Sequence, residues 1–145
     1  MKFPATVLAF AVVAIATPVI SNAQVTPHFC GVDTLRGTYV FAARGFNIVA
    51  GVAQPKAIVE VVEFNGDGTL SVPAATVSVN GVIVRPPPSI GTYTVEYDCS
   101  GTILFGGPAF DIFISWGADA IWMIQTNPNS VFQGTATRTS RGRER

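Results

Sequence analysis

Short apolar runs separated by tight turns dominate the chain after its first 23 residues. Apolar side chains alternate with small or polar ones along these runs, and helical spacing is almost absent, which is typical of β-strands. The turns are brief and rich in glycine and asparagine, as in "NGDG", "NG" and "DCSG". We predict nine strands, near 37–44, 56–64, 69–79, 82–85, 90–97, 102–106, 109–116, 120–126 and 131–138.

So many antiparallel strands between residues 37 and 139 must either close into a barrel or stack as two sheets, because open sheet edges promote aggregation. The short connections favour a single up-and-down antiparallel barrel of eight to nine strands. A two-sheet β-sandwich is the alternative. The segment "RPPPS" at 85–89 is the stiffest joint, since prolines cannot donate to a central ladder.

The first 23 residues have the features of a secretory signal peptide. Lys2 precedes the apolar run "ATVLAFAVVAIA", and Ser21 and Ala23 have the spacing that signal peptidase recognises. The run is too short for a membrane span, and no later stretch is long enough, so we do not expect an integral membrane protein. We expect a secreted or periplasmic protein with a leader over 24–36 and a disordered basic tail over 140–145.

Charge and motif content exclude several classes of function. The chain has nine Lys+Arg and nine Asp+Glu, and it lacks the clustered basic face of a nucleic-acid-binding protein. His28 is the only histidine, which excludes a multi-histidine zinc site and an ordinary Ser-His-Asp triad. A calcium loop at Asn65 and Asp67 would need further spaced ligands that are missing. We therefore expect no metal, no cofactor and no nucleic-acid partner.

The two cysteines, Cys30 and Cys99, both lie in the part expected to be exported. An isolated pair in an oxidising compartment most often forms a disulfide. This bond would tie the leader to the second of two similar hairpins. A catalytic thiol is the alternative, although no histidine near it in the sequence supports that reading.

One eight-residue pattern occurs twice, as "EFNGDGTL" at 63–70 and "EYDCSGTI" at 96–103. We interpret both copies as hairpins of one geometry, in which Asn or Asp begins the turn and Gly takes the left-handed position. This register places Phe64 opposite Leu70 and Tyr97 opposite Ile103.

Side chains alternate along a strand, so the register also decides which of them face the interior. Glu60 falls on the inward face between Ile58 and Val62, whereas Glu63 and Glu96 fall outward. The second copy places Tyr93 and Tyr97 inward, and "GTYVF" at 37–41 matches "GTYTV" at 91–95, which places Tyr39 inward as well. The expected interior therefore combines one carboxylate with several phenols.

Burial raises the pKa of a carboxyl group, so an interior glutamate can act as a general base or orient a ligand. In the alternative interpretation, Glu60 lies at the barrel mouth, where it is hydrated or paired with Arg44 or Arg85. The candidate catalytic residues are Glu60 and Tyr93, and the candidate ligand-binding residues are Tyr39, Tyr97, Phe64 and Gln125.

Residues of the later strands are assigned by the same alternation. We expect Asp111 to point outward, opposite an apolar face that includes Phe110 and Trp116; lining of the cavity is the alternative for Asp111. Gln125 shares the inward side with Met123. The outer face of strand 56–64 is also apolar, which suggests a homo-oligomer, with coverage by the leader or by "RPPPS" as the alternative.

The segment "GTYTVEYDCSGT" resembles small exported bacterial proteins of unknown role that share a "GTY…D-C-S/T-G-T" pattern. In architecture, the expected barrel is similar to the calycin group, and in particular to allene oxide cyclase and dirigent-like barrels. That resemblance implies an apolar cavity and catalysis mainly by shaping the substrate. No catalytic residue is carried over by motif.

Three functions are compatible with these features, because a fold alone does not choose between them. The first is binding of an apolar or aromatic small molecule in the barrel interior. The second is a cofactor-free isomerase, cyclase or lyase with Glu60 as acid/base. The third is a structural module with a filled core.

Overall fold

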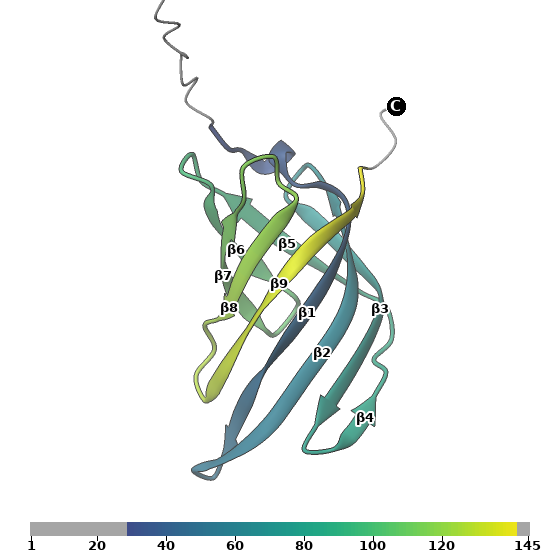
Figure 1. Cartoon of the computed structure of the whole chain (residues 1–145), viewed down its shortest axis with the longest axis vertical. Helices are drawn as coiled ribbons and strands as arrows, with labels where there is room; N and C mark the ends of the chain where they lie inside the picture. The colour runs from purple at the N-terminus through teal and green to yellow at the C-terminus, as the bar shows by residue number, and fades with distance from the viewer. Residues whose placement is uncertain (1–28, 142–145) are drawn as a thin grey trace, which may run out of the picture.

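The computed structural model describes residues 29–141 and shows an all-β fold (Figure 1). A short 3-10 turn, η1 (Val32–Thr34), leads into the strands. The nine strands are β1 (Arg36–Val49), β2 (Val52–Asn65), β3 (Thr69–Val79), β4 (Val82–Val84), β5 (Ser89–Val95), β6 (Ser100–Leu104), β7 (Ala109–Ile114), β8 (Ala120–Gln125) and β9 (Ser130–Ser140).

Eight of these strands form a closed antiparallel barrel. The sheet order is β2-β1-β9-β8-β7-β6-β5-β3, and pairing of β2 with β3 closes the ring. The remaining strand, β4, lies outside the ring and pairs with the C-terminal end of β3. The predicted barrel is therefore confirmed, and the β-sandwich alternative is wrong.

Strands β1 and β2 are longer than the sequence predicted. The segment between the expected strands continues their pairing down to a two-residue turn at Ala50 and Gly51. Both turn residues have positive φ, 49° and 79°, as a type I′ turn requires. Asn80 and Gly81 form the same turn between β3 and β4, with φ of 49° and 84°. The dipeptide Asn-Gly predicts such a turn from sequence, whereas Ala-Gly does not.

The inward side chains fill most of the barrel. Phe64 packs edge to face against Tyr39 and Tyr93, with ring centroids 5.1 Å apart in each pair. Farther along the barrel, Phe41 packs in the same way against Phe110, at 5.8 Å. The buried core thus extends from the end that carries η1 through the middle of the barrel.

A network around Arg138 and Tyr39 closes the end of the barrel that carries η1. The Tyr39 hydroxyl donates to the Ala118 carbonyl at 2.6 Å and accepts from Arg138 Nε at 2.8 Å. Arg138 Nη1 donates to the Gly117 carbonyl at 3.2 Å and lies 3.8 Å from an Asp119 carboxylate oxygen. These bonds join β1, β9 and the β7–β8 turn.

The predicted disulfide is present. Cys30 is bonded to Cys99, 69 residues later, and it links the segment before η1 to the β5–β6 turn. His28, the proposed signal peptide and residues 142–145 lie outside the described residues.

Candidate functional site

The two hairpins that suggested the site do not have the same register. Phe64 pairs with Leu70, as predicted. Ile103, however, pairs with Tyr93 rather than with Tyr97, so its partner lies four residues earlier in the chain than predicted.

Hydrogen bonds in the two turns explain the difference. In the first turn, Asp67 Oδ1 accepts from the Thr69 amide at 3.0 Å and from the Thr69 hydroxyl at 2.6 Å. In the second, Asp98 Oδ1 accepts from the amide and hydroxyl of Ser100 at the same two distances, 3.0 and 2.6 Å. These bonds hold the pKa of both aspartates below the ordinary range. Asp67 therefore corresponds to Asp98, and not to Ser100 as the sequence match suggested.

A shift of two residues leaves a side chain on the same face of a strand but moves one residue beyond the strand end. Tyr93 consequently faces the interior, as predicted. Tyr97 lies past the end of β5, is 63% exposed and stacks on Phe29 with ring centroids 3.9 Å apart. The expectation that Tyr97 points inward is wrong.

Glu60 faces the interior and is buried, with 8% of its surface exposed. It lies on β2 opposite Phe41 of β1 and Ala75 of β3. Within residues 29–141, no hydrogen bond reaches its carboxylate and no cation lies within salt-bridge distance. Burial raises the pKa of Glu60 to about 7, and the charge of Lys56 acts against this rise. Such a carboxyl group can exchange a proton near neutral pH.

Lys56 is an inward-facing residue of the same strand as Glu60, and sequence reasoning missed it. It precedes Glu60 by an even number of residues on β2, so alternation places both on the inward face, and this signal could have found it. The Lys56 ammonium lies 4.3 Å from the centre of the Phe132 ring. Burial lowers the pKa of Lys56, and Glu60 acts in the opposite direction. Arg44 and Arg85, the partners considered earlier, form no salt bridge with Glu60 in the described structure.

The tyrosines that were predicted to lie near Glu60 form hydrogen bonds with other groups. The Tyr39 hydroxyl belongs to the Arg138 network. The Tyr93 hydroxyl lies 2.8 Å from the Val32 carbonyl oxygen and 3.0 Å from that of Leu35. Burial raises the pKa of both tyrosines. Together with buried Phe64, they support the closed end of the barrel, and the structure does not join them to Glu60.

The other predicted positions are partly confirmed. Asp111 is exposed on the outer face of β7, as expected. Gln125 is half-buried at the end of β8, where it donates to Asn127 at 3.0 Å and accepts from Ser130 at 2.9 Å, so it shapes the β8–β9 turn. Trp116, expected on the apolar inner face, lies beyond β7 and is 72% exposed.

A large hollow lies on the outer wall, and sequence reasoning found only one of its sides, the apolar outer face of strand 56–64. The register aligns one outward row across five neighbouring strands. Small side chains occupy the middle of this row and large ones its ends. From β2 to β7, the row contains Val59, Ala42, Thr135, Trp122 and Phe113.

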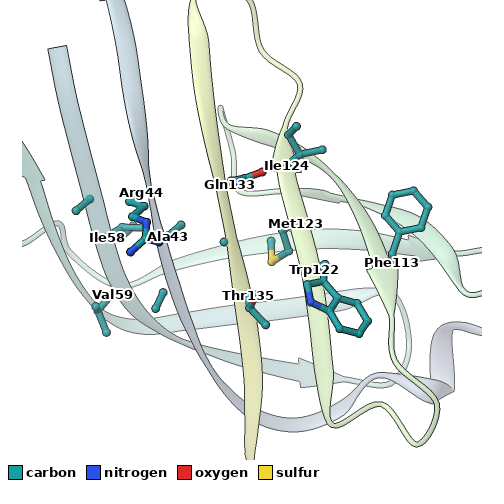
Figure 2. A pocket seen from close by; sticks show the side chains of 13 residues that line it. Ala43, Arg44, Ile58, Val59, Phe113, Trp122, Met123, Ile124, Gln133 and Thr135 are labelled. Atoms are coloured by element: carbon teal, nitrogen blue, oxygen red, sulfur yellow. The ribbon is translucent and has the colours of Figure 1, made fainter. Parts of the chain in front are cut away.

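This arrangement forms a groove of about 610 Å³, which we call the outer groove. Figure 2 shows Trp122 and Phe113 on one side of β9, and Val59 and Arg44 on the other. Ala57, Ile124 and Gln133 complete the neighbouring row. Two smaller hollows, of about 430 and 350 Å³, also open on the outer wall, around Leu104 of β6 and around Pro73 of β3.

Other kinds of site are not found in the part of the chain that the structure describes. Between Phe29 and Arg141, no three His, Cys, Asp or Glu side chains gather as metal ligands. No described helix is long and apolar enough to cross a membrane. The chain matches no protein-family model, and neither a curated protein nor a solved structure shows significant similarity to it.

Proposed function

We propose that this protein is an exported barrel that binds an apolar or aromatic small molecule, and that the outer groove is its binding site. The interior was the first expectation for this ligand. The three hollows described above open on the outer wall, however, and aromatic side chains occupy much of the interior. The outer groove therefore suits a ligand better.

The observation that carries this proposal is the row of small side chains between large apolar ones. Ala42 and Thr135 form a floor, and Val59 and Trp122 rise on either side. The volume of about 610 Å³ lies within the range of about 300–1,000 Å³ typical of small-molecule sites. The exposed indole of Trp122 offers a flat surface for an aromatic ring.

A titration with 2-naphthoate, followed by amide chemical shifts, tests this proposal. The expected shifts cluster on β1, β8 and β9 around the outer groove. Ala57→Trp fills the groove from an exposed position and should weaken binding about tenfold or more. The matched control is Thr102→Trp, on the outer face of β6, which should bind as the wild type does. Equal binding by both variants, or shifts confined to interior residues, would contradict the proposal.

A second candidate function rests on Glu60. Its pKa of about 7 suits a general base at neutral pH, which supports a cofactor-free isomerase, cyclase or lyase of the allene oxide cyclase-like type. Glu60 is 8% exposed and lies among the residues that line the hollow around Pro73, where a substrate would approach it. With a molecule that copurifies with the protein as substrate, Glu60→Gln should abolish turnover and retain binding. Unchanged turnover would remove Glu60 from the mechanism.

Experiments on the same purified protein would also reveal two alternatives to ligand binding. A homo-oligomer that covers the outer groove would appear as a dimer or larger species in light scattering, and Ala57→Trp would dissociate it. A structural module with a filled core would show neither ligand shifts nor a copurifying molecule. Both outcomes would replace the binding proposal.

A further inference from the structure

The two longest hairpins end in apolar tips. Figure 1 shows the β1–β2 and β3–β4 tips at the end of the barrel opposite η1 and the C-terminal strand end. We call residues 46–52 and 79–84 the hairpin end. Each tip is a two-residue turn flanked by exposed aliphatic side chains. The exposed fractions are 50% for Val49, 63% for Val52, 63% for Val82 and 54% for Ile83.

Most described carboxylates lie near the η1 end of the barrel, where Arg36 and Arg138 also lie, and none lies at the hairpin end. Residues 44–59 and 72–88, which include the hairpin end, contain three cations, Arg44, Lys56 and Arg85, and no Asp or Glu. The carboxylates of the β2–β3, β5–β6 and β7–β8 turns lie at the other end, with η1. The described acidic residues of that end are Asp33, Glu63, Asp67, Glu96, Asp98 and Asp119.

We propose that the hairpin end docks on an anionic lipid surface. Exposed aliphatic side chains on protruding turns can enter the boundary between headgroups and acyl chains, and flanking cations are attracted to anionic headgroups. This docking is independent of the function proposed for the outer groove.

The same features disfavour other occupants. Two copies joined through their hairpin ends would bring their cations together without a carboxylate from either end to balance them. A protein partner is generally held by a concave or flat complementary surface. The two tips instead project as separate turns (Figure 1). An anionic, deformable surface accommodates both the projections and the charge.

Vesicle sedimentation with the oxidised chain that begins at Gln24 tests this proposal. The probes are phosphatidylcholine vesicles with and without phosphatidylglycerol. We expect binding to the phosphatidylglycerol vesicles, with a partition coefficient that falls as salt is raised. The double variant Val52→Glu/Ile83→Glu should lower this coefficient about tenfold or more, and Arg44→Gln/Arg85→Gln should lower it with a weaker salt dependence.

The matched control carries the same change of charge away from the hairpin end. Ile90 and Leu104 are exposed aliphatic residues of β5 and β6, 80% and 51% exposed. Ile90→Glu/Leu104→Glu should therefore bind vesicles as the wild type does. Circular dichroism of each variant verifies folding.

Several results would overturn the proposal. The proposal is wrong if the wild-type protein stays in the supernatant with both kinds of vesicle. It is also wrong if the hairpin and control variants lose binding equally. A wild-type dimer in light scattering that Val52→Glu/Ile83→Glu converts to a monomer, without vesicle binding, would assign the hairpin end to a second copy.

Discussion

Glu60 has a buried carboxyl group whose pKa is perturbed by desolvation first and by Lys56 second. Removing a carboxylate from water disfavours its charged form, so the group keeps its proton to a higher pH in the folded chain than in the unfolded chain. This residue therefore makes the free energy of unfolding depend on pH.

The sign of that dependence follows from the two pKa values. Between the ordinary value of 4.5 and about 7, the folded state binds more protons than the unfolded state, so stability falls as pH rises through this window. The loss is at most roughly 3 kcal/mol for a shift of this size. Glu60→Gln should abolish this loss, as measured by urea unfolding at a series of pH values.

The matched control for this prediction is Glu96→Gln, which removes an exposed carboxylate from the β5–β6 turn. It should retain the fall in stability of the wild type. The interpretation of Glu60 would be refuted by a Glu60→Gln variant that loses stability over this window as much as the wild type does.

Alternation along strands was enough to place Glu60, Tyr39 and Tyr93 inward. It failed for Tyr97 because the register of the second hairpin depends on the hydroxyl group from which Asp98 accepts a hydrogen bond. The sequence match aligned Asp98 with the wrong residue of the first turn and so did not identify that hydroxyl group. The hydrogen bonds of the Tyr39 and Tyr93 hydroxyl groups could not be predicted, because their partners are carbonyl groups distant in sequence.

At the scale of elements, the hairpin turns determine the reach of β1 to β4. Alternating patterns predicted that all nine strands exist, but the ends of β1 and β2 depended on a turn whose first residue is Ala50. This residue has a φ of 49°, a left-handed conformation that alanine adopts at a cost. Asn80 occupies the corresponding position of the β3–β4 turn with the same φ of 49°.

Ala50→Asn should therefore stabilise the protein by roughly 0.5–1 kcal/mol, because asparagine tolerates the left-handed region better than alanine does. Chemical denaturation measures the change. The reciprocal variant Asn80→Ala should destabilise the protein by a similar amount. If both variants shift stability in the same direction, backbone conformation at these turns is not the cause.

The disulfide is the covalent link between the segment before η1 and the barrel. Cys30→Ser/Cys99→Ser removes a cross-link between residues 69 positions apart, for which the chain-entropy estimate is roughly 4 kcal/mol. We expect a lower midpoint of urea unfolding and faster proteolysis before Arg36. The midpoint of the wild-type protein under reducing conditions should match that of the variant. A variant as stable as the oxidised wild type would contradict this account.

For the whole molecule, closure of eight strands leaves β4 as the exception. The ring strands pair on both sides, whereas β4 has three exposed residues, and its outer edge meets no other strand of the described chain. Closure was predictable from strand number and short connections. The outer groove was not, because it depends on rows of side chains across five strands whose registers are set independently.

Native-state hydrogen exchange should reveal this difference. Amides of Val82–Val84 should exchange much faster than those in the middle of β1, because an exposed edge strand can open without unfolding of the ring. The middle of β1 should exchange only by global unfolding. Equal protection of the two segments would mean that β4 is an integral part of the barrel.

Both ends of the described chain leave the barrel on the same side. Thr38 of β1 pairs with Ser140 of β9, and the Cys30 amide donates to the Tyr97 carbonyl beside the β5–β6 turn. Figure 1 shows η1 and the end of β9 at the same end of the barrel. A polypeptide joined directly before Phe29 or after Arg141 would start from the end of the barrel that carries the acidic turns. A reporter domain, or attachment to a solid support, can therefore be introduced there while the opposite pole stays free to meet whatever it contacts.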